Sequence, residues 1–243
     1  MKRFVVITPV PQIIDSIVTN SILRQAVEKG LTEFHMINLR DFGEGNYRQI
    51  DDEPFGGGPG MVLMAEPLFA AVDAARDWLG DTDPVRFVYP SPQGQVWNYH
   101  TVRREMAGDN FIFLCGHYKG IDERVLAELK PVEYSLGDFV VSGGELPAMV
   151  MIDSMVRLIP GVLNDLDSAL TDSHVAELLD APWYTRPRTV KGQEVPEVLL
   201  SGHHQKIEQW RRKQREQRTR ERRPDLWEKY QQQKNSNEFT GES

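Results

Sequence analysis

The first part of the chain alternates between short β-favouring apolar runs and segments with helical periodicity, over roughly the first 160 of its 243 residues. Strands are predicted at Phe4–Thr8, Phe34–Leu39, Val85–Tyr89 and Phe111–Cys115. Helices are predicted between and after them, at Pro11–Lys29, Glu66–Leu79, Asn98–Met106, Asp122–Leu129 and Ala148–Ile159. This alternation is typical of an α/β domain with a largely parallel sheet.

Three loops of this domain would lie beyond the carboxyl ends of strands, where open α/β sheets place their ligand sites. They are Tyr89–Gly94, Gly116–Gly120 and the run from Ser135 to Pro147, which is rich in glycine. Glycine lets the main chain approach a ligand closely, and free N–H groups at a helix start suit a polar ligand group. A tight turn that only feeds a buried helix is the alternative. Both interpretations stay open at this point.

Beyond this domain the pattern lapses into polar, turn-prone residues from Gly161 to Ala181, which predicts a linker. A short helix is predicted at Val175–Leu179, then a proline-rich segment and a basic helical tail that Pro224 interrupts. Residues from Gln231 to Ser243 are predicted to be disordered.

Charge is divided unevenly along the chain. From Leu178 onward there are 14 Lys and Arg against 10 Asp and Glu, whereas the preceding part has 14 against 26. The basic residues of the tail are concentrated at Arg211, Arg212, Lys213, Arg215, Arg218, Arg220, Arg222 and Arg223. A basic terminal module on an acidic body favours a nucleic-acid partner, while a solvated helix supported by nearby glutamates is the alternative.

Composition bounds the class of protein. A hydrophobic content of 40% and a charged content of 26% fit a water-soluble globular chain. The apolar run at the start is too short for a signal peptide, and no run approaches a membrane span, so a cytoplasmic location is expected. The single cysteine, Cys115, excludes an intramolecular disulfide and is expected to be a buried, inert thiol.

Many segments together resemble the bacterial tRNA (guanine-N1)-methyltransferase family, a member of the SPOUT superfamily of knotted methyltransferases. The matching segments cover nearly the whole chain in order, and they are Asp51-Asp52, Pro54–Met61, Tyr89–Gly94, Phe113–Gly116, Gly120–Arg124, Ser135–Pro147, Arg157–Leu163, Leu178–Asp180, Tyr184–Pro187 and Val195–His204.

The resemblance implies an α/β, SPOUT-type parallel sheet with a deep trefoil knot that binds the cofactor, followed by a small, mainly helical C-terminal domain. The domains would be 1–162 for the methyltransferase, 163–177 for the linker and 178–243 for the tRNA-binding domain. Family members work as homodimers, with the active site at the subunit interface. They transfer a methyl group from S-adenosylmethionine to N1 of the guanosine immediately 3′ of the anticodon, position 37. Magnesium assists them, although no carboxylate cluster in this sequence identifies a metal site.

The resemblance also places the cofactor in the three loops named above, with one further contact from the C-terminal domain. The implied cofactor-binding residues are Tyr89, Ser91, Pro92, Gly116, Ser135, Leu136, Gly137, Asp138, Phe139, Val140, Val141, Gly143, Gly144, Pro147 and Asp180. The glycines would admit adenine and ribose close to the main chain, and the apolar side chains would supply walls.

Two residues match the family's catalytic positions. Asp172 would remove the N1 proton of guanine, a proton that must leave before N1 becomes a good nucleophile. By its local context alone, Asp172 would instead cap the helix predicted after it. Arg157 matches the catalytic arginine, and Asp153 four residues before it would also allow an ordinary helical ion pair.

The chain departs from the family pattern at several positions. His117-Tyr118-Lys119 stands where Arg-Tyr-Glu is usual, Phe139 replaces tyrosine, and Tyr47 and Glu177 replace histidine and glycine. Val10-Pro11-Gln12 replaces the usual Phe-Pro-Glu. The activity is expected to survive because none of these touches Arg157 or Asp172. The alternatives are a non-catalytic RNA-binding protein on the same scaffold and a SPOUT enzyme that acts on another RNA.

Overall fold

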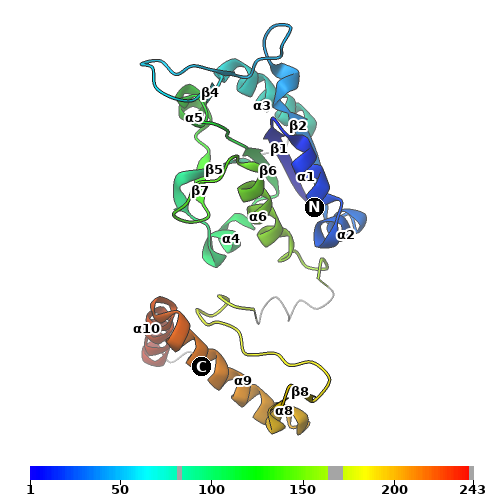
Figure 1. Ribbon diagram of the computed structural model, residues 1–243, viewed down its shortest axis with the longest axis vertical. Coiled ribbons are helices and arrows are strands. Elements are labelled where there is room, and N and C mark those ends of the chain that lie inside the picture. The colour runs from blue at the N-terminus through cyan, green and yellow to red at the C-terminus, as the bar shows by residue number, and fades with distance from the viewer. Residues whose placement is uncertain (81–83, 164–171, 241–243) are drawn as a thin grey trace. The chain divides into compact units, whose positions relative to one another are not determined.

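The computed structural model describes residues 1–80, 84–163 and 172–240, and the chain divides into two compact units, Met1–Leu166 and Asp167–Ser243. Figure 1 shows the elements of both units, which are described separately. The division falls inside the segment 163–177 that was predicted to be a linker, and residues 164–171 of that segment lie outside the described residues.

The first unit is built on a five-stranded sheet in which every pair of neighbouring strands runs parallel. The strand order is β2 (Thr32–Asn38), β1 (Lys2–Thr8), β6 (Asn110–Leu114), β5 (Val85–Val96) and β7 (Val132–Ser135). The predicted α/β domain with a largely parallel sheet is confirmed. All five residues of β6 are buried, as expected for a strand whose two faces are both covered.

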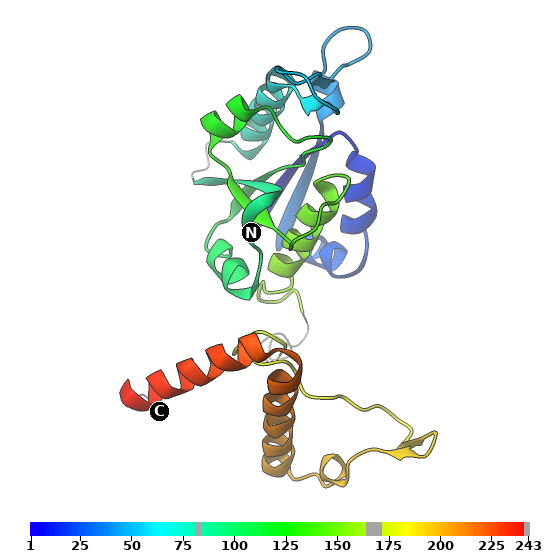
Figure 2. The ribbon, with the colours of Figure 1, turned by 60° about the vertical axis from the view of Figure 1, so that its left-hand side comes forward.

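Two hydrophobic clusters lie on opposite faces of this sheet. Successive side chains of β1 alternate between them, with Phe4 and Val6 in one and Val5 and Ile7 in the other. The first cluster is covered by α1 (Pro11–Val18), α2 (Ser21–Glu28), α4 (Tyr99–Glu105) and α6 (Glu145–Val156), and the second by α3 (Ala65–Leu79) and α5 (Glu123–Leu129). Figures 1 and 2 show the resulting three layers. Because the strands are parallel, their carboxyl ends share one edge.

The predicted helix over Pro11–Lys29 is two helices in the structure, so that prediction was wrong in its middle. α1 ends at Val18, and α2 begins at Ser21 with a φ of 52°. Between them, the Thr19 hydroxyl donates to the carbonyl of Asp15, and the Asn20 amide donates to the carbonyl of Ser16. Such side-chain bonds compete with the main-chain bonds that would continue a helix.

Other elements of the unit shift their ends. β5 continues past Tyr89 to Val96, through residues that were predicted to form a turn. α6 begins at Glu145 rather than Ala148 and ends before Pro160-Gly161, where Gly161 has a φ of 87°. A short 3₁₀ helix, η1 (Leu39–Phe42), and an antiparallel pair, β3 (Asp51–Asp52) with β4 (Val62–Leu63), fill the segment between β2 and α3.

The second unit is mainly helical. It contains the small hairpin β8 (Thr189–Val190) and β9 (Gln193–Glu194), then α8 (Glu197–Leu200), α9 (His204–Arg222) and α10 (Pro224–Thr240). Pro224 separates α9 from α10, as predicted. α10 runs to Thr240 through residues predicted to be disordered, and residues 241–243 lie outside the described part of the chain.

Residues 173–176 form turns rather than the start of the helix predicted at Val175–Leu179. Two residues here have left-handed backbones, His174 with a φ of 77° and Glu177 with a φ of 56°. A left-handed residue ends helical propagation, which explains the difference. Glu177 stands at the position where glycine is common in the resembling family, and glycine adopts this conformation without strain.

Candidate functional site

A cleft of about 420 Å³ opens at the carboxyl ends of β5, β6 and β7 in the first unit. Its walls come from the three loops that were predicted to meet at this edge. The predicted cofactor residues that line it are Tyr89, Ser91, Pro92, Gly116, Ser135, Leu136, Phe139, Val140, Val141, Gly143, Gly144 and Pro147. The structure therefore brings most of the predicted cofactor residues together.

The first wall arises from a bulge in β5. Tyr134 of β7 pairs with both Pro90 and Gln95, so the residues between them have no partners of their own in that ladder. Gly94 is required at the end of the bulge, because an added Cβ would lie 2.4 Å from main-chain atoms of Glu133 and Tyr134. The bulge explains why β5 is longer than predicted, and it presents Ser91, Pro92 and Gln93 to the cleft.

Main-chain contacts join the other two walls, which are the loop Gly116–Gly120 and the run Ser135–Pro147. The N–H of Gly144 donates to the carbonyl of Gly116 at 2.9 Å, and His117 forms an antiparallel bridge with Gly143. A Cβ on Gly144 would lie 2.8 Å from the Cα of Cys115, and one on Gly116 would lie 2.9 Å from the Tyr89 ring. Glycine is therefore needed at both positions for this close approach. We call the Gly144–Gly116 hydrogen bond and the His117–Gly143 bridge together the glycine staple.

A buried polar group lies at the start of α6, in contact with His117 of the cleft lining. Glu145 is 2% exposed, and its carboxylate accepts a hydrogen bond from the Thr8 hydroxyl and contacts His117 Nε2 at 2.8 and 3.0 Å. Burial by itself raises the pKa of Glu145, but the hydrogen bonds from His117 and Thr8 outweigh it and hold the pKa below the ordinary 4.5. The carboxylate is therefore ionised at neutral pH.

Two other titratable groups of the cleft region stay protonated. Burial, assisted by the charge of Glu133, raises the pKa of Tyr89 above 10. Burial raises the pKa of Cys115 well above its usual range, and the charge of Glu145 adds to the effect. The predicted burial of Cys115 is confirmed at 2% exposure, and its thiol is not a nucleophile at neutral pH.

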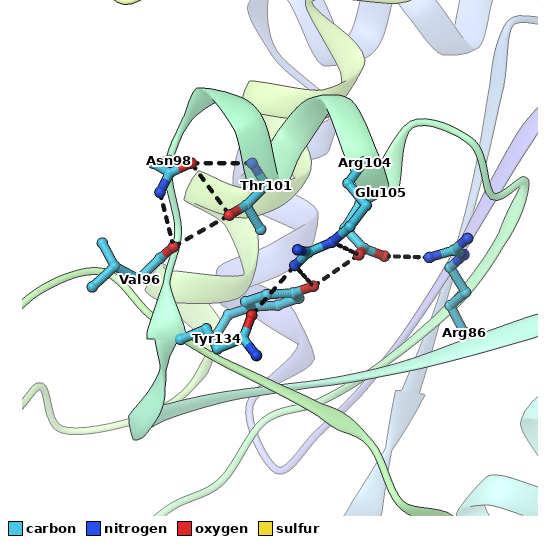
Figure 3. A network of polar contacts seen from close by, with 8 residues as sticks. Arg86, Val96, Asn98, Thr101, Arg104, Glu105 and Tyr134 are labelled. Atoms are coloured by element: carbon cyan, nitrogen blue, oxygen red, sulfur yellow. Dashed lines mark hydrogen bonds and ion pairs between the residues drawn. The ribbon is translucent and has the colours of Figure 1, made fainter. Parts of the chain in front are cut away.

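A second polar network holds Tyr134 behind the bulge of β5 (Figure 3). The Tyr134 hydroxyl donates to Glu105 at 2.8 Å and accepts from Arg104 at 3.0 Å, and Arg86 donates to the same carboxylate at 2.9 Å. The Trp97 ring meets the Tyr134 ring edge-on, with centroids 4.9 Å apart. Burial raises the pKa of Tyr134, so the phenol keeps the proton it donates.

Several residues of the cleft were not among the predicted site residues. They are Pro90, Gln93, His117, Tyr118, Lys119, Gly120, Ile121, Glu123, Leu126, Glu133, Tyr134 and Ser142. His117 to Gly120 directly follow a buried strand and lie in a loop that was predicted to be near the site, so their position in the sequence could have identified them. Glu123 lies in the matching segment Gly120–Arg124, whereas Leu126 and Glu133 carried no signal in the sequence.

Gly137 and Asp138 do not line the cleft. Gly137 instead shapes the turn after β7, with a φ of 151°, and its N–H donates to the Ser135 hydroxyl at 3.1 Å. Its carbonyl accepts from the N–H of Phe139 at 2.9 Å. Asp138 is exposed in that turn. Gly137 therefore shapes the turn that precedes Phe139, Val140 and Val141, which do line the cleft.

The remaining predicted residues belong to different units. Arg157 is the C-cap of α6 in the first unit, where its charge opposes the rise that burial produces in the pKa of Asp153. Asp172 and Asp180 lie in the second unit. A turn rather than a helix follows Asp172, so Asp172 is not the helix cap considered above. The Asp180 carboxylate accepts from the N–H of Ala181 and from Trp183 Nε1, both at 2.6 Å.

Within the described residues, no group of three or more His, Cys, Asp or Glu side chains is arranged to hold a metal ion. No residue is therefore assigned to magnesium. The helices in the described ranges include none that is long and apolar enough to cross a bilayer.

An open parallel sheet with a glycine-walled cleft at its carboxyl edge defines an α/β domain of the kind that binds nucleotide-like small molecules. The chain belongs to the tRNA (Guanine-1)-methyltransferase TrmD family, whose model matches residues 1–229. It is 47% identical to the tRNA (guanine-N(1)-)-methyltransferase of Chlorobaculum tepidum, over 92% of this chain and 96% of that protein.

Two further relatives carry the same name. The protein of Christiangramia forsetii is 48% identical, over 92% of this chain and 98% of its own. That of Clostridioides difficile is 45% identical, over 93% and 98%. The family match covers both units, so it includes the cleft and the basic helix α9. The resemblance described from the sequence is confirmed.

Proposed function

We propose that this chain transfers a methyl group from S-adenosylmethionine to N1 of the guanosine immediately 3′ of the anticodon in tRNA. Family membership shows the activity itself, which is methylation of guanine N1 in tRNA. The position of the target base, the cofactor contacts and the roles of individual residues are the parts that we propose.

The residues of the cleft fit the cofactor. Its volume of about 420 Å³ falls within the range of about 300–1,000 Å³ usual for small-ligand sites. The glycine staple brings the loops at Gly116 and Gly144 together along the cleft, while Leu136, Val140 and Pro147 give apolar walls. S-adenosylmethionine bound there supplies an electrophilic methyl group. Asp180 stays a predicted cofactor contact from the second unit.

The chain's own residues must then make guanine N1 a nucleophile. Asp172 accepts the N1 proton, and Arg157 stabilises the negative charge that develops on guanine O6. A free carboxylate is a weak base for this proton, so orientation and charge stabilisation carry part of the barrier reduction.

The second unit supplies the RNA contacts in this proposal. Helix α9 carries most of the basic residues of the tail, and Arg212, Arg220 and Arg222 are exposed on it. Such residues neutralise phosphates and position the RNA without reading its sequence. The target guanosine must leave its stack to reach the cleft, as for other enzymes that act on bases. A cytoplasmic location would give the enzyme access to tRNA.

We also propose that two copies form the active unit. Helix α6 is apolar nearly all round, and Leu146 and Val150 lie one turn apart on its exposed side, 57% and 51% exposed. Val140 beside the cleft is 81% exposed. An apolar face of this kind, continuous with the cleft, suits a second copy of the chain. Val150→Glu should convert the dimer to monomer in analytical ultracentrifugation.

The knot is likewise a proposal. Strand β7 lies at one edge of the sheet, yet the chain after it returns to Gly116 at the end of β6, and α6 packs with α1 and α2. The chain therefore crosses the carboxyl ends of the strands between β7 and α6. Passage of this segment through the loop before it would produce the trefoil knot of the family.

One experiment tests the proposed function. The enzyme is incubated with S-adenosylmethionine carrying a labelled methyl group and a tRNA with guanosine next to the anticodon, and the labelled nucleotide is then mapped. We expect N1-methylguanosine at that position. Label elsewhere would indicate an enzyme that acts on another RNA site. Cofactor that fails to bind in calorimetry would indicate a non-catalytic RNA-binding protein.

A further inference from the structure

The second unit displays two large aromatic side chains at its surface, before α9 in the sequence. Trp183 is 64% exposed and Tyr184 is 49% exposed. The Arg211 guanidinium lies over the Trp183 ring, 4.5 Å from its centroid. The Tyr184 ring lies beside Trp210, with centroids 6.4 Å apart. Exposed aromatic rings clustered in this way usually indicate a binding surface.

Trp183 is held in place although it is exposed. Its indole N–H donates to one carboxylate oxygen of Asp180, and the other oxygen accepts from the N–H of Ala181. The side chain is thus fixed at its polar edge by Asp180 and on one face by Arg211. A ring immobilised before binding loses little conformational entropy when a ligand stacks on it. The rest of the ring is open to solvent.

The surroundings indicate what would stack there. Arg211 belongs to α9, the helix that also carries Arg212, Lys213 and Arg215. A polyanion is the partner that complements this charge, and an unpaired nucleobase is the flat ligand that complements an indole beside a guanidinium. An apolar protein partner would complement the ring but not the basic residues around it.

We propose that Trp183, flanked by Tyr184 and Arg211, is a stacking platform for one unpaired base of the tRNA substrate. The platform rests on the proposed function in so far as that function makes tRNA the substrate. Stacking of this kind tolerates any base, so the platform contributes affinity and placement rather than sequence selection. Asp180 is then a positioning residue for Trp183, in addition to any contact with the cofactor.

The test measures tRNA affinity of the full-length protein without S-adenosylmethionine, over a series of salt concentrations. Trp183→Ala should raise the Kd about ten-fold at every salt concentration. The slope of log Kd against log salt should stay unchanged, because no phosphate contact is lost. Trp183→Phe, which keeps a ring, should lose less. Arg220→Met, which removes a charge from the same helix, should instead reduce the slope.

A fluorescence measurement guards against misfolding of the alanine variant. tRNA should quench part of the indole emission of the wild-type protein, and that part should be missing in Trp183→Phe. Equal Kd values for Trp183→Ala and wild type would overturn the platform. A reduced salt slope in Trp183→Ala would also overturn it. The same holds if tRNA quenches the emission of Trp183→Phe by as much as that of the wild type.

The outcome is separable from that of the proposed function. Binding is measured without cofactor, so it is independent of methyl transfer. If wild-type enzyme methylates guanine N1 while Trp183→Ala binds tRNA normally, only the platform is overturned. If the platform is present and no methyl is transferred by the wild type, only the proposed function is overturned.

Discussion

The imidazole Nε2 of His117, a residue that lines the cleft, contacts both carboxylate oxygens of Glu145, at 2.8 and 3.0 Å. The pair joins the loop after β6 to the start of α6, next to the glycine staple. The Thr8 hydroxyl completes the group from β1. Tyr118 lies beside the imidazole ring, and the charge of Glu145 adds to the rise that burial produces in the pKa of Cys115. His117 of the cleft lining is therefore held in place by one buried anion.

The lowered pKa of Glu145 makes a pH-dependent contribution to stability. Its folded-state pKa lies below 4.5, so the unfolded state binds more protons in the acid range, and stability falls as pH falls through the folded pKa. Glu145→Gln should flatten the fall in the free energy of unfolding below about pH 4.5, as measured by urea denaturation at several pH values. Glu44→Gln, at an exposed glutamate, should leave the profile unchanged. Equal profiles for Glu145→Gln and wild type would contradict this.

Gly144→Ala should weaken cofactor binding by at least ten-fold. Its Cβ would meet the main chain of Cys115 at 2.8 Å and the N of Gly116 at 2.9 Å, so one wall of the cleft must move. Gly30→Ala is the matched control, because its φ of 66° makes alanine costly while its Cβ meets nothing within 4 Å. The control should lose about 1–2 kcal/mol of stability and bind the cofactor normally. Calorimetry measures both affinities, and an unchanged Kd in Gly144→Ala would remove the glycine staple from the site.

Asp172→Asn and Arg157→Ala should abolish methyl transfer while S-adenosylmethionine still binds. General-base catalysis is worth roughly 10²–10⁴-fold, so kcat of Asp172→Asn should fall by about that factor. Single-turnover methylation gives the chemical rate, and calorimetry gives the cofactor Kd. Asp15→Asn, at an exposed aspartate of α1, should behave as wild type. A kcat of Asp172→Asn close to that of wild type would exclude Asp172 as the base.

Tyr134→Phe removes one hydroxyl from the network behind the β5 bulge and keeps the ring against Trp97. The loss of its bonds to Glu105 and Arg104 should cost about 1 kcal/mol in the free energy of unfolding. Because Tyr134 lines the cleft and its hydroxyl bonds fix the ring, KM for S-adenosylmethionine should rise while kcat at saturation stays near wild type. Thr101→Val, in the same helix as Glu105 but outside the cleft, is the control. A fall in kcat with unchanged KM would argue against a positioning role.

The three-layer domain could be predicted because its signals are local. Apolar runs such as Phe111–Cys115 and the helical period of Glu66–Leu79 each specify an element, and parallel topology then gathers the loops at one edge. The helix break at Asn20 and the bulge of β5 opposite Tyr134 could not be predicted, because each depends on hydrogen bonds between particular atoms. Glu123 and Glu133 line the cleft because α5 and β7 pack beside it. The roles of Arg157 and Asp172 rested on family resemblance alone.

The glycine staple has a consequence for inhibition of this enzyme. Main-chain contacts join the two loops at Gly116 and Gly144, so substitutions at Lys119 or Ser142 would change the chemistry of the cleft lining without removing those contacts. A compound that contacts only main-chain atoms of these loops would leave few routes to resistance, because substitutions change side chains. A compound that needs the Lys119 ammonium would bind this enzyme in preference to relatives with glutamate at that position. A single substitution of Lys119 would abolish that binding.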